Sequence, residues 1–371
     1  MELLLKKNTV YNQLRKDIVS GKLRAGEKLP QGVELAKELG VSHNTLRSAL
    51  SKLEKDGYIA MIHGKGTFVY PDNAKSQATS TIMVLHGEDS GFEAPWRYIV
   101  PEISRYAAEK QLKTFITTDA AMNIFSESDV RDFVKANNVI GIVPVMNSFN
   151  GNEPILARMK AAGVPVVIAH SSYQDTDVTG FASICIPERG GWEDAIAYLA
   201  GIGHKHIGIL GFANHSDDEF SVRPFRFYSY QETLDLLKKY GAANDPELIK
   251  ESAFNKDKIR EKVEELFQNQ HKPTAILCFS DFFAIYVYEA LKKMKLKIPD
   301  DVAVMGICGY PDAKLLSPPL SSIDYGYAEI AEMAVKMLEE PDKWFAPLTG
   351  KGRQRIKPYK LIKRASTEFK Q

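Results

Sequence analysis

Residues 28–69, which read KLPQGVELAKELGVSHNTLRSALSKLEKDGYIAMIHGKGTFV, decide the architecture at the N-terminal end of this 371-residue chain. The first half of the stretch predicts two short helices that meet at a tight turn. Pro30 is placed to open the first helix, because proline fits a first helical turn. Gly40 suits the left-handed cap that ends a helix, and Ser42 is a good N-cap for the next one. The stretch therefore predicts a helix-turn-helix unit.

The second helix of this unit has an apolar rear and a polar front. Leu46, Leu50 and Leu53 share the inward face, whereas the first turn is polar. A helix of this kind fits the major groove of double-stranded DNA, where Asn pairs with adenine and Arg pairs with guanine. The DNA-contact residues that we predict on this helix are His43, Asn44, Thr45 and Arg47.

A two-stranded hairpin is predicted directly after the second helix. Residues 58–63 read as one strand, residues 64–66 (GKG) as the tip and residues 67–70 as the returning strand. Two glycines at the tip let the backbone and one cation approach a phosphate or a minor groove. We therefore expect His63 and Lys65 to contact DNA. The alternative interpretation, a small helical domain capped by a hairpin, is disfavoured by the order of helix, turn, helix and glycine-tipped wing.

Residues 8–70 resemble the winged helix-turn-helix domain of GntR-type regulators. The matching residues include Tyr11, Leu29, Pro30, Glu34, Leu35, Ala36, Gly40, Val41, Ser42, Thr45, Leu46, Arg47, Gly57 and residues 64–69 (GKGTFV). The chain departs from the family at two places that are typical of DNA contact. Residues 31–33 (QGV) replace a Ser-Glu or Thr-Glu pair and the polar or basic residue after it, and His43 replaces an Arg. The resemblance implies DNA binding without fixing the operator sequence.

Chain length and charge indicate more than one domain. A chain of 371 residues accommodates two or three domains of ordinary size. Residues 1–70 contain 12 basic and 7 acidic residues, a net charge of +5, whereas the remainder contains 36 and 40, a net charge of −4. A basic module on a mildly acidic body is typical of a DNA-binding head joined to a part with another task. We assign the head to residues 1–70, a polar linker to residues 71–80 (PDNAKSQATS) and the body to residues 81–371.

Cysteine usage and hydropathy limit where the protein works. Cys185, Cys278 and Cys308 lie in apolar stretches without a metal-type spacing, so we predict neither a metal site nor a cofactor. No apolar run is long enough to cross a membrane, and residues 3–5 (LLL) are too short for a signal-peptide core. We expect a cytoplasmic protein with no membrane partner.

The body alternates short apolar runs with amphipathic helical stretches. The apolar runs are 82–85, 113–117, 139–145, 164–169, 183–186, 206–210, 275–278 and 302–307. The helical stretches are 96–110, 126–137, 153–162, 189–202, 226–240, 256–269, 281–294 and 326–339. This alternation predicts an α/β fold with parallel, doubly wound sheets. The units are too many for one compact sheet, so we expect two lobes with a ligand cleft between them.

Residues 81–365 resemble the effector domain of LacI/GalR-type repressors, which is similar to periplasmic sugar-binding proteins. The matching motifs are residues 203–208 (GHKHIG), 226–230 (RFYSY), 298–306 (IPDDVAVMG) and 319–323 (PLSSI). The pairing of a GntR-type head with such a body is typical of sugar-responsive bacterial repressors. The resemblance implies a winged helix-turn-helix head on a two-lobed, periplasmic-binding-protein-like body.

The resemblance also implies a pocket, but one with altered residues. Arg226 matches the arginine that bonds sugar hydroxyls in the family. Ser280-Asp281 stands where members usually have Asn-Asp, and Cys308 stands where they usually have an aspartate. Buried sugar hydroxyls without partners cost about 1–3 kcal/mol each. Either the ligand differs from an ordinary hexose or other residues, Ser280 and Asp281 among them, replace the missing groups.

Further ligand-binding candidates lie in the first lobe, where strands end and pockets form. Asp89 and Phe92 follow the first strand, and Trp96 starts the next helix, where its ring either stacks on a sugar or packs in the core. Asn147 and His170 follow two other strands. With Arg226, Ser280, Asp281 and Cys308, these residues form the predicted ligand set.

Enzyme activity is not indicated, because the chain has no G-x-S-x-G, H-E-x-x-H or G-x-x-x-x-G-K-[ST] motif and no catalytic residue is predicted. We predict a transcription regulator, a homodimer that binds a two-fold symmetric DNA operator and responds to a small ligand, expected to be a sugar. The alternatives are a cytoplasmic carbohydrate-binding protein and a regulator that responds to a non-sugar metabolite.

Overall fold

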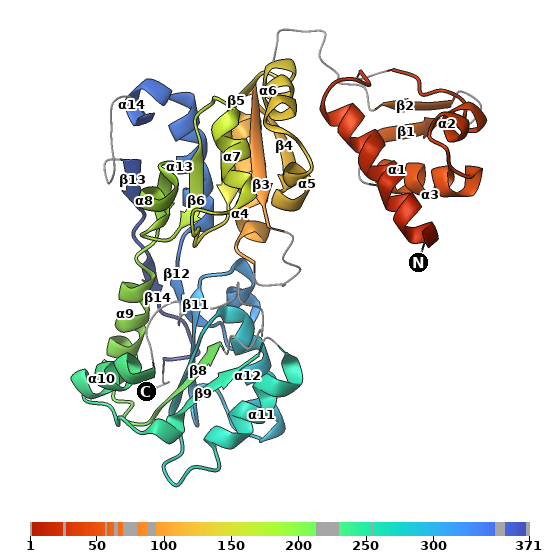
Figure 1. Ribbon diagram of the computed structural model, residues 1–371. Coiled ribbons are helices and arrows are strands. Elements are labelled where there is room, and N and C mark those ends of the chain that lie inside the picture. Colours follow the sequence, from red (N-terminus) through yellow and green to blue (C-terminus); the bar gives the residue numbers. More distant parts are fainter. Residues whose placement is uncertain are drawn as a thin grey trace.

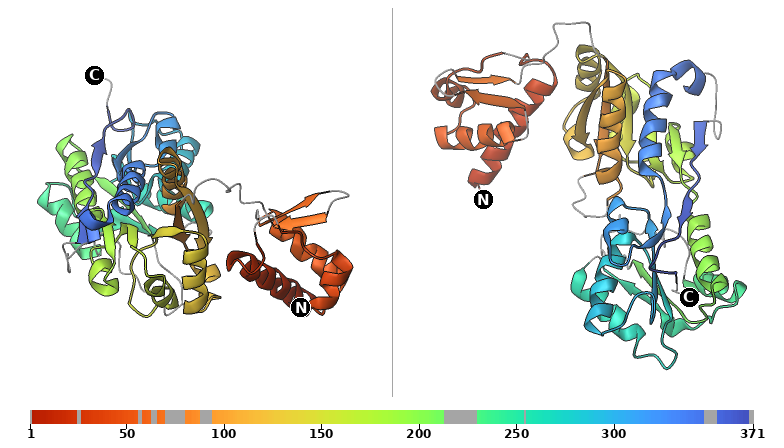
Figure 2. Two further views of the ribbon diagram at one scale, coloured as in Figure 1. Left: turned by 90° about the horizontal axis from the view of Figure 1, so that it is seen from above. Right: turned by 180° about the vertical axis from the view of Figure 1, so that it is seen from behind.

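The computed structural model describes residues 2–24, 27–55, 58–62, 66–69, 80–87, 94–212, 230–253, 255–345 and 353–368 (Figure 1). The chain forms a small N-terminal head and a larger body of two lobes. The head lies beside the first lobe, as both views in Figure 2 show.

The head contains three helices and a two-stranded antiparallel hairpin. Its elements are α1 (Glu2–Val19), α2 (Gly32–Glu38), α3 (His43–Lys55), β1 (Ile59–Ile62) and β2 (Gly66–Val69). Leu14 of α1 packs against Leu46 and Leu53 of α3, and all three side chains are buried. This apolar contact fixes α3 against α1 and confirms the predicted winged helix-turn-helix.

Two of the three predicted helix boundaries in the head are correct. Gly40 adopts the left-handed conformation with φ of 64°. The backbone N–H of Thr45 donates to Ser42 Oγ at 3.2 Å, as expected of an N-cap. The prediction that Pro30 opens the first helix is wrong, because α2 begins at Gly32 after Gln31, whose extended backbone (ψ 145°) holds Pro30 outside the helix.

The first lobe has a parallel sheet flanked by helices on both faces (Figure 1). Its strands are β3 (Thr81–His86), β4 (Lys113–Thr118), β5 (Val139–Val145), β6 (Val167–Ser171), β7 (Ala182–Cys185) and β13 (Gln354–Ile356). They form two three-stranded sheets, β4-β3-β5 and β6-β7-β13, which a bridge between Ile142 and Val166 joins edge to edge. The helices are α4 (Trp96–Glu109), α5 (Asp119–Asn123), α6 (Glu127–Ala136), α7 (Pro154–Ala161), α8 (Asp175–Thr179), α13 (Tyr327–Glu339) and α14 (Pro341–Phe345).

The second lobe repeats this plan around a six-stranded sheet in the order β14-β12-β11-β10-β8-β9. The strands are β8 (Ile207–Phe212), β9 (Ile249–Ser252), β10 (Ala275–Cys278), β11 (Ala303–Cys308), β12 (Ser321–Asp324) and β14 (Lys360–Ile362), and only the β12–β14 pair is antiparallel. The helices are α9 (Glu188–Gly201), α10 (Tyr230–Lys239), α11 (Lys256–Leu266) and α12 (Asp281–Lys293), with short 3-10 turns η1 (Pro246–Leu248) and η2 (Pro311–Leu315).

The chain crosses between the lobes three times, after β7, after β12 and after β13 (Figure 1). Three short connections therefore join the two lobes. The two-lobed α/β body with parallel sheets is therefore confirmed, and each predicted apolar run and helical stretch overlaps an observed element. Within the described ranges, no helix has both the length and the apolar character needed to cross a bilayer.

Candidate DNA-reading surface and ligand cleft

The start of α3 presents a polar surface to solvent. The side chains of His43, Asn44 and Arg47 are exposed, whereas Leu46 and Ala49 behind them are 1% and 0% exposed. The apolar rear anchors the helix in the head, so its polar front is free to enter a DNA groove. The structure thus places three predicted contact residues together on one exposed surface.

Thr45 differs from its neighbours, because its side chain is only 6% exposed. Its hydroxyl lies 2.8 Å from Ser42 Oγ, and its N–H donates to the same oxygen. Thr45 therefore stabilises the first turn of α3. Its predicted contact with DNA stays a prediction.

The wing forms as predicted, with β1 and β2 paired from Ile59↔Val69 to Ile62↔Gly66. The predicted contacts His63 and Lys65 lie outside the described residues. Sequence reasoning missed Lys28 at the base of the wing. A Cβ on Gly66 would lie 2.7 Å from Lys28 Cε, so glycine at this position lets the lysine pass close to the hairpin backbone.

Aromatic side chains from both lobes meet in the cleft. Tyr98 of α4 stacks on Tyr310, which follows β11 of the second lobe, with ring centroids 4.4 Å apart. The ring centroid of Tyr327 lies 5.7 Å from that of Tyr310. The Phe282 ring contacts the Tyr310 ring edge-on. Burial is the main cause that raises the pKa of Tyr98 to about 12, and the nearby carboxylates of Asp312 and Asp281 raise it further. The lobes therefore touch across the cleft through a neutral aromatic stack.

A polar group lies beside this stack at the carboxyl ends of the first-lobe strands. His170 is 4% exposed and has φ of 60°, a left-handed conformation that is uncommon outside glycine. Its Nδ1 lies 3.2 Å from Asn147 Nδ2, and its Nε2 lies 3.7 Å from Glu188 Oε1. The rings of Tyr325 and Tyr327 flank the imidazole. The structure thus brings together Asn147, His170 and Glu188, whose donors and acceptors suit a ligand rich in hydroxyl groups.

Trp96 packs within the first lobe. Its ring stacks on His86 at the end of β3, with centroids 4.1 Å apart, and the Arg97 guanidinium lies 4.9 Å from the ring centroid. Of the two interpretations that the sequence left open for Trp96, these contacts favour packing. A ligand that used the ring would have to share it with these neighbours.

Asp281 is buried, and its carboxylate is occupied by the protein itself. It accepts hydrogen bonds of 2.6 Å from the backbone N–H of Tyr310 and from Ser322 Oγ. Burial raises the pKa of Asp281 to about 7. A Cβ on Gly306 would collide with Asp281 Oδ1, so the glycine makes this close approach possible. These contacts make Asp281 a residue that positions the loop carrying Tyr310.

The other altered pocket positions are also buried. Ser280 is 1% exposed at the N-terminus of α12, and Cys308 is 8% exposed at the end of β11. Cys308 has φ of 100° and is followed by Gly309 with φ of 70°. The C=O of Cys308 accepts from the N–H of Tyr325 at 3.3 Å. Cys308 thus lies at a sharp backbone turn where the second lobe meets the connection between the lobes.

Three predicted ligand residues, Asp89, Phe92 and Arg226, lie outside the described residues.

Sequence reasoning missed the tyrosines Tyr98, Tyr310, Tyr325 and Tyr327. The rule that identified Asn147 and His170 also applies to Tyr310, two residues after the end of β11, and to Tyr325, directly after the end of β12. Over the described ranges, no group of His, Cys, Asp and Glu side chains is arranged to hold a metal ion.

Comparison with known proteins agrees with this geometry. Residues 6–69 match the bacterial regulatory proteins of the gntR family, and residues 196–367 match the periplasmic binding protein-like domain. The chain is 24% identical over 346 residues to the arabinose metabolism transcriptional repressor of Geobacillus stearothermophilus, which covers 89% of this chain and 91% of the relative.

Solved structures share the fold of the body. A putative LacI transcriptional regulator from Bacillus cereus subsp. cytotoxis superposes with a TM-score of 0.58 at 23% identity, over 79% of this chain and 100% of the other. A LacI family regulator from Enterococcus faecium with bound ribose superposes with a TM-score of 0.56 at 16% identity, over 77% of this chain and 98% of the other. The chain therefore carries a region that matches the gntR family and a region that matches the periplasmic binding protein-like domain, and it is similar to transcription regulators of the LacI/GntR type.

Proposed function

We propose that this regulator is a repressor whose operator binding is controlled by a sugar bound in the cleft between the lobes. The observation that carries the proposal is the exposed polar front of α3, anchored by a buried rear, on a chain whose body has a two-lobed cleft. The head supplies DNA recognition and the body supplies ligand recognition. Each part has a surface suited to its task.

On the DNA side, His43, Asn44 and Arg47 are the side chains placed to reach base edges or phosphates. The net charge of +5 on residues 1–70 favours approach to the phosphate backbone. One head reads only a short half-site. Two chains associated through their bodies would place two heads on a two-fold symmetric operator, and we therefore propose a homodimer.

On the ligand side, Asn147, His170 and Glu188 offer an amide, an imidazole and a carboxylate beside tyrosine rings. Sugars have hydroxyl groups, which suit these polar side chains, and apolar C–H faces, which suit the tyrosine rings. The repressor from Geobacillus stearothermophilus is named for arabinose and the Enterococcus faecium structure contains ribose. Pentoses are therefore the first ligands to test.

A second candidate effector is a non-sugar metabolite. The observation that favours it is Cys308, because a buried thiol stands where the resemblance implies a carboxylate for sugar hydroxyls. Asp281 already accepts hydrogen bonds from Tyr310 and Ser322, which leaves fewer of its acceptor sites for a sugar hydroxyl. The same binding screen distinguishes the two candidates.

The test uses the full chain in two independent assays. Thermal unfolding is followed with arabinose, ribose, cellobiose, sugar acids and nucleosides, because a ligand that binds only the folded state raises the Tm. DNA recognition is measured by selection from a random duplex library. A pentose that raises the Tm and changes the affinity for the selected DNA would support the proposal. Selected DNA without symmetry, or no enrichment at all, would contradict the operator model, and a response to nucleosides alone would favour the second candidate.

A further inference from the structure

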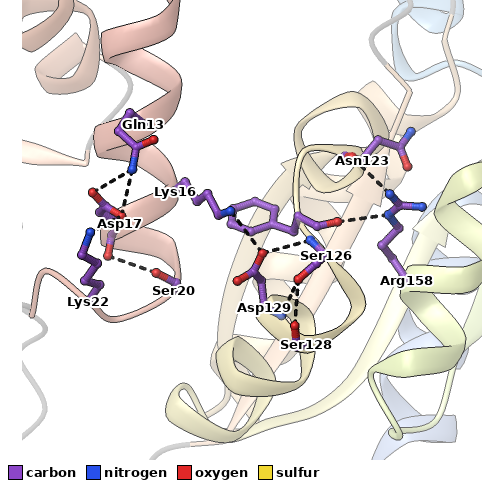
Figure 3. Close-up of polar contacts among 11 residues, drawn as sticks. Gln13, Lys16, Asp17, Ser20, Lys22, Asn123, Ser126, Ser128, Asp129 and Arg158 are labelled. Atoms are coloured by element: carbon purple, nitrogen blue, oxygen red, sulfur yellow. Dashed lines mark hydrogen bonds and ion pairs between the residues drawn. The ribbon is translucent and has the colours of Figure 1, made fainter. Parts of the chain in front are cut away.

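We propose that the head docks on the first lobe through α1, and that this docking surface sets the orientation of the DNA-reading helix relative to the cleft. Its regulatory meaning rests on the proposed function, whereas the docking itself does not. Figure 3 shows the centre of the surface, where the end of α1 faces α6. The partner that this surface fits is the first lobe of the same chain.

Three kinds of contact join the two parts. Lys16 Nζ lies 3.3 Å from Asp129 Oδ2, and Arg15 Nη2 donates to Thr117 Oγ1 at 3.2 Å. Arg15 Nε donates to the hydroxyl of Tyr58 at 2.7 Å, and the Tyr58 ring packs against the apolar core of the first lobe. The contacts combine an ion pair, a charge-assisted hydrogen bond and an apolar side chain, as specific interfaces do.

Asp129 is held in place before Lys16 reaches it. Asp129 and Ser126 form a capping box at the start of α6, in which Asp129 Oδ2 accepts from the Ser126 N–H at 3.0 Å and the Asp129 N–H donates to Ser126 Oγ (Figure 3). The hydrogen bond from the Ser126 backbone is the main cause that lowers the pKa of Asp129. The first lobe therefore presents a fixed, ionised carboxylate to the lysine.

Docking leaves the DNA-reading surface uncovered. Within the head, the apolar rear of α3 packs on α1, while His43, Asn44 and Arg47 remain exposed. The docked state consequently orients α3 without blocking it. In a dimer, the angle at which each head is held decides whether both helices can enter successive major grooves.

The docking surface is also connected to the cleft by two neighbouring strands of the first-lobe sheet, β4 and β3. Thr117 lies on β4 and pairs with Leu85 of the neighbouring strand β3. The next residue of β3 is His86, which stacks on Trp96. Arg15 therefore touches the strand adjacent to the one that ends at the cleft. A ligand that shifts this edge of the first lobe would shift the surface on which the head rests.

The surface is suited to a reversible contact. The side chains of Lys16 and Asp129 are 37% and 27% exposed, and an ion pair this accessible to water contributes little. A small free-energy change from ligand or DNA is then enough to shift the population between docked and released heads. A large apolar interface would not respond in this way.

A disulfide provides the direct test. A Cβ on Gly21 would lie 3.9 Å from the Cβ of Ala136, within the range for a disulfide, and both residues are exposed. Gly21 has φ of 74°, which strains any side chain, so the control pair carries the same substitution at Gly21. The three native cysteines are buried, which limits competing oxidation. We expect the full-length Gly21→Cys/Ala136→Cys variant to form an intramolecular disulfide at dilute protein concentration under mild oxidation. The pair Gly21→Cys/Lys160→Cys, with the second cysteine exposed on α7, is the control.

Charge reversal tests the contacts themselves in the disulfide-forming variant. Lys16→Glu should lower the rate of cross-linking by about twofold to fivefold, which is the range expected for the loss of an exposed ion pair. Lys37→Glu makes the same charge change at an exposed residue of α2, separated in the chain from both engineered cysteines, so it should leave the rate unchanged. The double change Lys16→Glu/Asp129→Lys should recover part of the rate.

The outcomes separate docking from the proposed function. Cross-linking needs neither DNA nor ligand, so a chain that cross-links but selects no DNA would contradict only the proposed function. Cross-linking no faster than in the control pair, or equal effects of Lys16→Glu and Lys37→Glu, would overturn the docking surface. If docking orients α3, oxidation of the Gly21→Cys/Ala136→Cys variant should change its affinity for the selected DNA, and reduction should restore it. An affinity that is the same in both redox states would overturn the orienting role.

Discussion

The carboxylate of Asp281 accepts a 2.6 Å hydrogen bond from the N–H of Tyr310, whose ring stacks on Tyr98 of the opposite lobe. A buried acid in the second lobe thus holds in place the residue through which the two lobes touch. The contact between the lobes therefore depends on a buried side chain that lines the same cleft. This relationship leads to the first two predictions.

We expect Asp281 to contribute to the pH dependence of the free energy of unfolding. Burial raises its pKa from 3.8 to about 7, so between about pH 4 and pH 7 the folded state holds the proton more tightly than the unfolded state. The free energy of unfolding contributed by this group therefore falls as the pH rises through that window and levels off above it. Asp281→Asn should flatten this part of the curve, measured by denaturant unfolding at several pH values. Asp312→Asn, at an exposed pocket residue, should leave the curve unchanged, and an unaltered slope in Asp281→Asn would contradict the assignment.

Removal of the aromatic stack should open the body. Tyr98→Ala deletes the ring that contacts Tyr310, and an aromatic pair contributes about 0.5–1.5 kcal/mol beyond the area that it buries. We expect a larger radius of gyration in small-angle X-ray scattering of the ligand-free chain. Tyr98→Phe keeps the ring and should scatter like the unmodified chain. Identical scattering from Tyr98→Ala would show that the stack does not hold the lobes together.

Arg47 should contribute to DNA affinity through its exposed position on α3. If its guanidinium reads a base, Arg47→Ala should weaken binding to the selected DNA by about 1–3 kcal/mol and relax specificity at one position. Fluorescence anisotropy with the selected duplex and with single-base variants measures both effects. Lys22→Ala removes an exposed positive charge of the head outside α3 and is the matched control. Equal losses in the two variants would indicate a general electrostatic contribution in place of base reading.

His170 should be required for the ligand response. His170→Asn removes the imidazole but keeps a residue that tolerates the left-handed backbone observed there, so the fold should be preserved. We expect the Tm increase caused by the effector to disappear while the affinity for the selected DNA without effector stays unchanged. Asn147→Ala should show a smaller loss of the same kind. A normal Tm response in His170→Asn would place the ligand elsewhere.

The sequence predicts the parts of this molecule that depend on local patterns. The amphipathic spacing of Leu46, Leu50 and Leu53 is enough to define α3, and buried strands such as β5 stand out as continuous apolar runs. The strands β13 and β14 do not, because each has three residues, with polar or charged side chains at the start, and forms only through pairing with distant β7 and β12. Tertiary contact decides these elements.

The site shows the same division. The predicted position after a strand end identified Asn147 and His170, whose side chains the structure brings together, although His170 lies within β6, which continues to Ser171. The burial of Thr45 was not predicted, because the pattern of the helix front does not reveal that its hydroxyl turns back to Ser42. The predicted ligand role of Asp281 stays a prediction, but its hydrogen bond to the loop that carries Tyr310 was not predicted, because this loop lies close only in the folded chain. Side-chain direction at these positions depends on neighbours that the sequence does not place.

The three crossings between the lobes have a consequence for biosynthesis. Neither lobe is a continuous segment, because β13, near the C-terminal end, completes the sheet of the first lobe. During translation, the first lobe lacks this edge strand until residues 354–356 have left the ribosome, and β14 then completes the second lobe directly afterwards. The head can fold early, whereas both lobes of the body become complete almost simultaneously. A nascent chain therefore acquires its DNA-reading part long before it acquires a finished sensor.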